Sequence, residues 1–157
     1  MSQIQDLLNP ETIVARAKWA SRKQVISELS EKLAKAHALN PAIVYEAVIE
    51  REKLGSTGVG EGVAIPHARV EGVDHPIGAF ARLEEAVDFD AIDERDCDLI
   101  FLLLCPVDSG ADHLRALAKV SRVMRQSDVR DALRHAQSVD AVLDAFTLSN
   151  KSQTSAA

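Results

Sequence analysis

The residues from Gly55 to Val70 include the groups best suited to chemistry. Four glycines, at positions 55, 58, 60 and 62, give a backbone that can turn sharply and approach another molecule closely. The apolar run Val63–Ile65 predicts a short strand, which Pro66 ends because proline lacks a backbone donor. His67 follows directly, and a neutral imidazole with an unperturbed pKa of about 6.5 can attack phosphorus at neutral pH. The pattern predicts a histidine beside a flexible, glycine-lined opening, suited to accepting or passing a charged group.

The same segment resembles the active-site segment of a known family. Its residues Gly-Ser-Thr-Gly-x-Gly-x-Gly-x-Ala-Ile-Pro-His are similar to those of the IIA proteins of the bacterial phosphotransferase system. The match is to the fructose/mannitol class and, within it, to the nitrogen-related IIA branch. The likeness covers residues 5 to 147 and includes Glu50–Leu54 upstream and Phe89–Asp93 downstream. The resemblance implies that His67 carries a phosphoryl group.

The resemblance also implies two supporting residues. His113, which is followed by a leucine, matches the family histidine that lies beside the phosphorylated one and helps to hold the phosphoryl oxygens. It falls in the first turn of an expected helix, where free N–H groups favour an anion. Arg51 matches the family arginine that reaches the active site, and its planar guanidinium can bind two phosphoryl oxygens. Without the resemblance, His113 is a solvent-exposed histidine and Arg51 is a surface residue in a weak ion pair.

Other polar residues carry less signal. Arg69 could steer an acidic donor or a phosphate, but a solvated arginine fits the pattern equally well. Ser56 and Thr57 could donate hydrogen bonds to phosphate, although turns use both residue types routinely. Glu61 could orient an imidazole or simply be exposed. The remaining histidines match nothing in the family pattern and are expected to be structural or solvent-facing: His37, His75 and His135.

The elements around this segment alternate between helices and strands. Strands are expected at 12–17, 63–65, 77–83 and 98–105, and the last is so apolar that it should be central and covered on both faces. Helices are expected after the caps Ser21 and Asn40, after residue 110, and after the caps Ser127 and Ser138. The expected inner residues of the second and third helices are Ile43, Val44, Ala47 and Val48, and Leu114, Leu117, Ala118 and Met124. This order predicts one α/β sandwich with a central mixed sheet and helices on both faces.

Length and composition favour a small globular protein. The chain has 157 residues, 46% of them hydrophobic and 27% charged, which allows a core of its own. Residues 1–148 are expected to form the domain and residues 149–157 a disordered tail with little to bury. Cys97 and Cys105 flank one expected strand. At about 3.3 Å per residue they would lie roughly 26 Å apart, which is too far for a disulfide between them, so both are expected to be reduced thiols.

Charge and hydropathy also exclude some classes of function. The net charge of −6 argues against a general nucleic-acid binder, which would present a basic face. The first eight residues lack the basic start and continuous apolar stretch of a signal peptide. The longest apolar run, Leu99–Cys105, is too short to span a bilayer, so a cytoplasmic protein is expected.

Three other functions fit parts of the pattern. A nucleotide-binding domain also uses glycines, but here they follow a helix and precede a strand, and no Walker ending is present. A metal hydrolase could use His67, His75 and His113, yet no His-Glu-x-x-His or comparable cluster supports it. A sugar-specific IIA component, passing phosphate to a fructose- or mannitol-type permease IIB domain, differs from the regulator only in its partners.

The sequence therefore predicts a histidine phosphocarrier. The resemblance implies that a histidine-containing phosphocarrier protein is the donor, that phosphoenolpyruvate is the ultimate source, and that regulatory proteins are the targets. No cofactor or metal is expected, because the transfer asks for positioning and charge compensation. The Ser-Thr-Gly segment and the lack of a fused permease part favour the regulatory branch. Ala68-Arg69 departs from the small residue and lysine or threonine found after the histidine in many relatives, which bears on partner preference.

Overall fold

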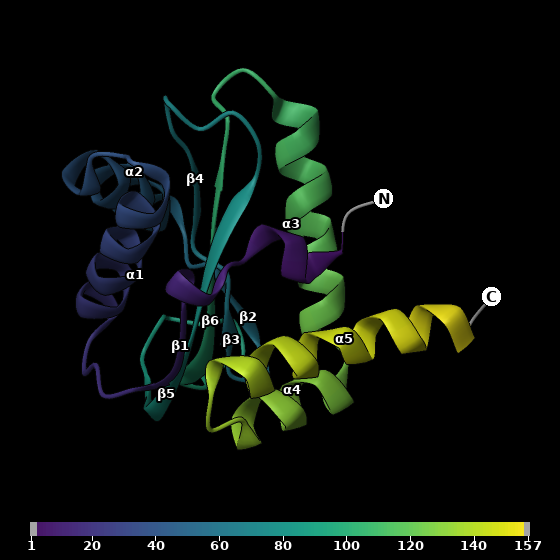
Figure 1. The fold of residues 1–157 in the computed structure, drawn as a ribbon. Helices are drawn as coiled ribbons and strands as arrows, with labels where there is room; N and C mark the ends of the chain where they lie inside the picture. The colour runs from purple at the N-terminus through teal and green to yellow at the C-terminus, as the bar shows by residue number, and fades with distance from the viewer. Residues whose placement is uncertain (1–2, 156–157) are drawn as a thin grey trace.

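A six-stranded mixed sheet separates two groups of helices (Figure 1). The structure, a computed structural model, describes the backbone of residues 3–155 and the side chains of residues 3–149. The strands are β1 (Ile13–Ala17), β2 (Gly58–Gly60), β3 (Val63–Ala64), β4 (His67–Arg69), β5 (Ile77–Val87) and β6 (Cys97–Cys105). The helices are α1 (Arg22–His37), α2 (Pro41–Leu54), α3 (Gly110–Met124), α4 (Ser127–His135) and α5 (Val139–Ser155), preceded by the 3-10 turns η1 (Ile4–Leu7) and η2 (Pro10–Thr12).

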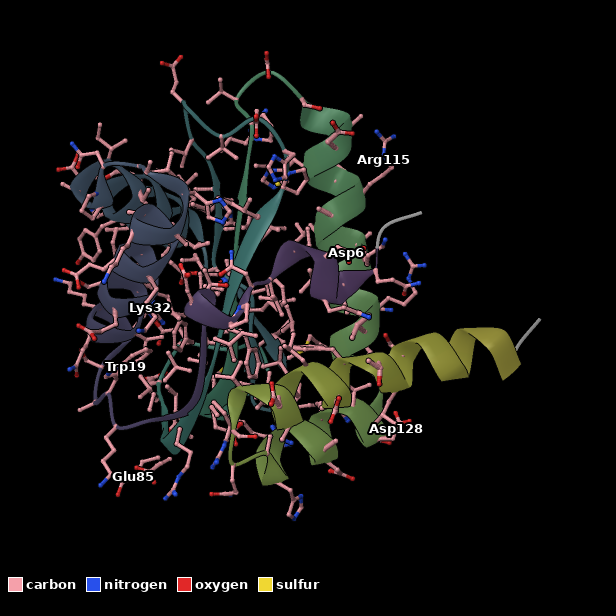
Figure 2. The ribbon with its side chains drawn as sticks, in the orientation of Figure 1. Asp6, Trp19, Lys32, Glu85, Arg115 and Asp128 are labelled. Carbon is pink, nitrogen blue, oxygen red and sulfur yellow. The ribbon has the colours of Figure 1, made fainter. Side chains whose placement is uncertain are left out.

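The layers match the expected fold class, which is confirmed. Helices α1 and α2 cover one face of the sheet, and α3, α4 and α5 cover the other (Figure 1). Charged side chains such as Glu85, Arg115 and Asp128 point away from the layers (Figure 2). Within the described part of the chain, no helix combines the length and the apolar character needed to cross a membrane.

Strand β6 lies at the centre of the sheet, as its apolar sequence predicts. It pairs with β5 antiparallel on one side, and with β3 and β4 parallel on the other. Strands β3 and β4 follow one another along β6, and the carbonyl of Pro66 between them accepts from the N–H of Leu103 at 2.9 Å. Proline therefore interrupts the strand without breaking its path, and His67 is placed opposite Leu103.

The caps of the first two helices agree with the sequence. The hydroxyl of Ser21 accepts from the N–H of Gln24 at 3.1 Å, and the Gln24 side chain accepts from the N–H of Ala20 at 2.8 Å. Asn40 accepts from the N–H of Ala42 at 2.9 Å, ahead of a helix whose first residue is proline. These caps satisfy N–H groups that the first helical turn leaves without partners.

Three details of the helices differ from expectation. Ser127 is the first residue of α4, and Gln126 takes the cap position. Ile43 is 54% exposed and Leu114 is 68% exposed, and Ala118 is also exposed. The core face of α3 is formed by Ala116, Val120, Val123 and Met124. Leu114 lies in the first turn of α3, which borders a surface pocket and has no core to pack against there.

The C-terminal helix and the cysteines complete the comparison with the sequence. Helix α5 reaches Ser155 and so overlaps the expected tail of 149–157, while residues 156 and 157 lie outside the described residues. Ser149 is buried, and its hydroxyl donates to the carbonyl of Phe146 at 2.9 Å.

Cys97 and Cys105 are buried and free, as expected. Burial raises the thiol pKa of Cys97 to about 12 and that of Cys105 to about 11.

Candidate functional site

His67 is the first residue of β4, and its ring is held in one orientation. The residue is only 9% exposed. Its Nδ1 lies 2.8 Å from the carbonyl oxygen of Ile65. A carbonyl oxygen can only accept a hydrogen bond, so Nδ1 must carry the hydrogen. In the neutral ring this leaves the lone pair on Nε2, which is the nitrogen available to attack an electrophile.

His113 stands beside this ring, in the first turn of α3. The two imidazole centroids are 5.3 Å apart, with an angle of 75° between the ring planes. The Nδ1 of His113 is buried and has no hydrogen-bond partner among the described residues. An unpaired buried nitrogen is costly, so this group is poised to pair with a molecule that enters the site.

Both histidines open onto a pocket of about 700 Å³ between α2, β4 and α3. Arg51 from α2 and Arg69 from β4 line the same pocket. One guanidinium nitrogen of Arg51 donates to the carbonyl of Gly55 at 2.9 Å, which anchors the side chain at the helix end. Among the residues that the structure describes, neither arginine takes part in an ion pair. The pocket therefore holds two guanidinium groups without a direct ion pair, and the one carboxylate in its described lining, that of Glu50, pairs with Lys53.

The surroundings of the pocket favour the neutral form of both imidazoles. Burial lowers the pKa of His67, against the opposing effect of the hydrogen bond to Ile65, and the charge of Arg51 lowers it further. Burial also lowers the pKa of His113, with smaller contributions from Arg69 and Arg51. A neutral imidazole beside two guanidinium groups combines a nucleophile with groups that bind an anion, which suits phosphoryl transfer.

The glycine segment does not line this pocket, so the expected glycine-lined opening is wrong. The glycine that borders the pocket is Gly110, at the start of α3. The turn that contains Gly60 and Gly62 lies at the other end of β3, and the five residue steps of extended chain from Gly62 to His67 span roughly 16 Å. The spacing in sequence is short, but an extended strand between the turn and His67 separates them in space.

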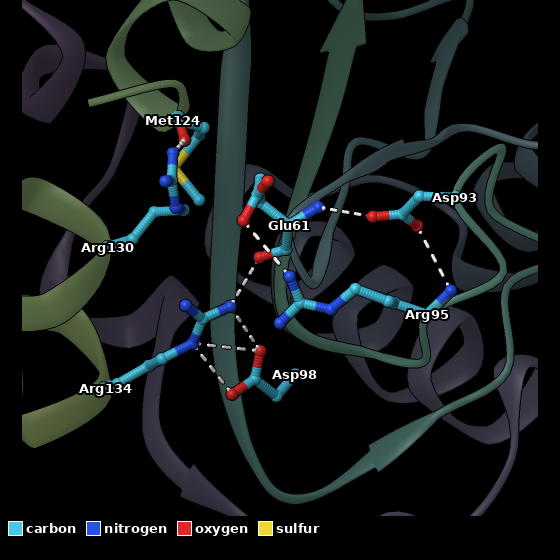
Figure 3. Close-up of polar contacts among 7 residues, drawn as sticks. All are labelled: Glu61, Asp93, Arg95, Asp98, Met124, Arg130 and Arg134. Carbon is cyan, nitrogen blue, oxygen red and sulfur yellow. Dashed lines mark hydrogen bonds and ion pairs between the residues drawn. The ribbon is translucent and has the colours of Figure 1, made fainter. Parts of the chain in front are cut away.

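Glu61 belongs to that distant turn and does not orient the imidazole. Its carboxylate pairs with Arg95 at 3.1 Å, and its carbonyl accepts from Arg134 at 2.6 Å (Figure 3). Arg134 also forms a two-nitrogen contact with the carboxylate of Asp98 at 2.9–3.2 Å (Figure 3). This network fastens the turn to α4 and to the start of β6.

Ser56 and Thr57 hold the loop that follows α2. The hydroxyl of Ser56 donates to the carbonyl of Phe89 and accepts from the N–H of Gly58 at 3.0 Å. The hydroxyl of Thr57 donates to the carboxylate of Glu52, and both residues are buried. Neither hydroxyl lines the pocket, so the structure gives them a role within the loop.

The other histidines are not brought to the site. His75 is exposed and pairs with Asp74, and His135 is exposed and lies beside the carbonyl of Asp131. No group of three or more His, Cys, Asp or Glu side chains in the described part of the chain is arranged to hold a metal ion. The metal-hydrolase alternative, which needs His67, His75 and His113 together, therefore has no support.

Sequence reasoning missed one part of the site and left another undecided. Leu54 and Leu114 form an apolar rim, 85% and 68% exposed, on either side of the pocket. Helical periodicity could not reveal it, because Leu114 fits an inward stripe and Leu54 is the last residue of its helix. Arg69 was left undecided by the sequence, and its alternation with His67 along β4 is the signal that places both at one pocket.

Comparisons with known proteins bear on this pocket. The family model described as "Phosphoenolpyruvate-dependent sugar phosphotransferase system, EIIA 2" matches residues 6–148. The nitrogen regulatory protein of Bradyrhizobium diazoefficiens is 42% identical over 145 residues, which cover 92% of this chain and 95% of that protein. The crystal structure of nitrogen regulatory protein IIA-Ntr from Neisseria meningitidis is similar, with a TM-score of 0.85 and 39% identity over 92% of this chain and 99% of that one. The mannitol IIA of Escherichia coli has a TM-score of 0.75 at 27% identity, covering 88% of this chain and 98% of that one.

Proposed function

The chain belongs to the EIIA 2 family of the phosphoenolpyruvate-dependent sugar phosphotransferase system, and we propose that it carries a phosphoryl group on Nε2 of His67. The observation that carries this proposal is the hydrogen bond from Nδ1 of His67 to the carbonyl of Ile65 at 2.8 Å. It leaves Nε2 as the nucleophile, in a pocket that also contains Arg51 and His113. The pocket thus has an acceptor and groups that can balance the charge of a phosphoryl group.

The proposed step moves one phosphoryl group between two imidazoles. The lone pair on Nε2 of His67 attacks the phosphorus of a phosphohistidine on a histidine-containing phosphocarrier protein. A new P–N bond forms as the P–N bond of the donor breaks; the donor ring, which carries a hydrogen on its other nitrogen, takes the electron pair and leaves as a neutral imidazole. The His67 ring keeps its Nδ1 hydrogen, and the carbonyl of Ile65 stabilises the positive charge that develops on the ring.

Arg51 and His113 are proposed to hold the oxygens of the transferred group. The guanidinium of Arg51 is fixed at the end of α2 by its bond to Gly55, so little freedom is lost when it binds an anion. His113 lies at the N-terminal turn of a 15-residue helix, where backbone N–H groups and the helix dipole also favour negative charge. Phosphorylation supplies an anion for Arg51 and Arg69, neither of which forms an ion pair in the described part of the chain.

The output of the protein is proposed to be regulation of partner proteins. The relative from Bradyrhizobium diazoefficiens, which this chain matches over 95% of that relative's length, is named a nitrogen regulatory protein. Its name favours a regulatory role over a sugar-specific one. The exposed side chains of Leu54 and Leu114 line the same pocket as the proposed phosphorylation site. A phosphoryl group at His67 adds about −1.5 to −2 charges, if it resembles other phosphorylated side chains, and changes which partners can dock.

The proposal is tested by reconstituting the phosphoryl relay. The purified protein is incubated with phosphoenolpyruvate, the phosphoryl-transfer enzyme that uses it and the histidine-containing carrier, and its intact mass is measured. We expect one phosphoryl adduct that is lost in acid and survives in base, as a P–N bond does. An acid-stable adduct would place the group on serine or threonine and contradict the proposal.

A further inference from the structure

Three buried polar residues form a connected set behind the pocket. In the described part of the chain, the buried polar or charged residues are Thr12, Ser30, Glu52, Thr57, His67 and Ser149. Three of these residues, Glu52, Thr57 and His67, are joined by hydrogen bonds that run through the main chain of Ile65. A buried carboxylate is costly, so its retention at this position calls for an explanation.

The first part of the set joins Glu52 to the loop after α2. One carboxylate oxygen of Glu52 accepts from the hydroxyl of Thr57. The other lies 3.7 Å from a guanidinium nitrogen of Arg22 and has no hydrogen-bond partner among the described residues. Arg22 is held in turn by Asp90 at 3.0 Å and by the ring of Phe89, whose centroid lies 5.4 Å from its guanidinium carbon. The carboxylate of Glu52 is therefore fixed from two sides.

The second part of the set joins Thr57 to the imidazole. The main-chain carbonyl of Thr57 accepts from the N–H of Ile65 at 2.9 Å. The carbonyl of the same Ile65 accepts from Nδ1 of His67 at 2.8 Å. Because both bonds are made by the main chain of Ile65, on adjacent peptide groups, Thr57 helps to position the Ile65 carbonyl, together with the bond from Leu103 to the carbonyl of Pro66. That carbonyl in turn decides which nitrogen of His67 carries the hydrogen.

Helix stability gives no reason for an acidic residue at position 52. Glu52 lies in the last turn of α2, which ends at Leu54. The helix dipole is negative at this end, so a carboxylate there is electrostatically unfavourable and a basic residue is preferred. Burial acts in the same direction and raises the pKa of Glu52. A role outside the helix accounts for the residue better than a role within it.

We propose that Glu52 is a positioning residue that, through Thr57 and Ile65, holds His67 in the tautomer with Nε2 unprotonated. Glu52 touches neither the pocket nor the transferred group, and it acts through the two residues between. The consequence for phosphoryl transfer rests on the proposed function. The tautomer does not, because it can be measured in the free protein without any donor.

The test is nitrogen and proton NMR of the histidine side chains in ¹⁵N-labelled protein at a pH where His67 is neutral. The variant Thr57→Val keeps the shape of the side chain and removes the donor to Glu52, and Thr57→Ser restores a hydroxyl. We expect His67 to be the Nδ1–H tautomer in the wild type, to gain a clear Nε2–H population in Thr57→Val, and to return in Thr57→Ser. Glu52→Gln, which keeps an oxygen but loses the charge that acts on Arg22 and Arg51, should give a smaller Nε2–H population than Thr57→Val.

The matched control is Glu46→Gln, which makes the same change in charge at an exposed position of α2 and should leave the tautomer unchanged. If Thr57→Val folds and His67 keeps its wild-type tautomer, the proposal is wrong. If Thr57→Val does not fold, the same measurement is made on Glu52→Gln, and an unchanged tautomer of His67 in that variant would make the proposal wrong. Labelling in the relay should slow roughly tenfold in Thr57→Val, the effect of losing one well-placed hydrogen bond. A wild-type protein that is never labelled would refute the proposed function and leave the tautomer result standing.

Discussion

Strands β3 and β4 follow one another along β6, and arginines lie at both ends of this pair of strands. Only the arginines at the end that contains the Gly60–Gly62 turn form ion pairs with carboxylates in the described part of the chain. At the turn end, Arg134 contacts the carboxylate of Asp98 at 2.9 Å, and Arg95 contacts that of Glu61 at 3.1 Å (Figure 3). At the pocket end, Arg51 donates to a main-chain carbonyl and forms no ion pair in the described part of the chain, while its neighbour Glu50 pairs with Lys53. Paired charges fasten elements to one another, whereas cations left beside a neutral imidazole are available to an anion.

The glycine-rich half and the Ile-Pro-His half of the Gly55–His67 segment therefore have different roles. The glycines at the turn end serve the network there, because a side chain at Gly62 would collide with the guanidinium of Arg134 and come within 2.9 Å of Asp98. Gly62 also has a φ of +78°, which L-residues rarely adopt. The Ile-Pro-His half of the motif instead fixes the imidazole at the pocket. The first half is therefore expected to affect stability and the second to affect phosphoryl transfer.

The largest expected effect is at the pocket end. His67→Ala should fold and gain no phosphoryl adduct in the reconstituted relay, because no other imidazole there has its Nδ1 bound to a carbonyl and its Nε2 left as the nucleophile. His75→Ala, which removes an exposed histidine, is the control and should be labelled like the wild type. Full labelling of His67→Ala, measured by intact mass, would overturn the assignment of the acceptor.

The next largest effect is expected on the labelling rate when the residues that balance the charge of the phosphoryl group are replaced. A charge-assisted hydrogen bond contributes about 1.5–3 kcal/mol, which corresponds to roughly 10- to 100-fold in rate. Arg51→Ala and His113→Ala should each slow labelling within that range, measured by quenched time courses under single-turnover conditions.

Arg95→Ala is the matched control for Arg51→Ala, since it removes an arginine from the turn end. It should be labelled at the wild-type rate. Equal rates for Arg51→Ala, His113→Ala and the wild type would mean that the two pocket residues have only structural roles, and the contrast between the two ends would fail.

At the turn end the expected effect is on stability. Gly62→Ala should lower the free energy of unfolding by about 1–3 kcal/mol, through backbone strain and the collision with Arg134. Urea denaturation followed by circular dichroism measures this change. The labelling rate of the folded variant should stay at the wild-type value, and a slow variant with unchanged stability would show that the turn acts on the chemistry.

The smallest effect is on pH dependence. Burial lowers the pKa of His67, so the unfolded chain binds a proton near pH 6.5 while the folded protein binds it only at lower pH. The contribution of His67 to stability is thus fully present above about pH 6.5 and declines as the pH falls from there to the folded pKa. Urea midpoints across this range should fall more steeply for the wild type than for His67→Ala, and parallel curves would contradict the lowered pKa.

The sequence predicts most of the fold because its signals are local. The caps Ser21 and Asn40 and the apolar run of β6 depend on neighbours within a few residues, and all three are found as expected. The exposure of Leu114 was not predictable, because periodicity marks an apolar stripe and cannot show that the first turn of α3 borders a pocket.

The candidate site was predictable only in part, because it joins distant segments. The family resemblance led to His67, His113 and Arg51, and the structure brings the three to one pocket. The buried contact between Glu52 and Thr57 could not be inferred, since an acid at the end of a helix is usually solvated. The position of Glu61 was also beyond the sequence, because its partners Arg95 and Arg134 are 34 and 73 residues away along the chain.

The central claim is that Nε2 of His67 is the phosphoryl acceptor. The most direct measurement is nitrogen and phosphorus NMR of ¹⁵N-histidine-labelled protein after phosphorylation in the relay, with the His67 signals assigned from His67→Ala. The account predicts a phosphorus–nitrogen coupling to Nε2 of His67, while Nδ1 of the same ring keeps its hydrogen bond to Ile65. Coupling to Nδ1 of His67, or to either nitrogen of His113, would contradict it.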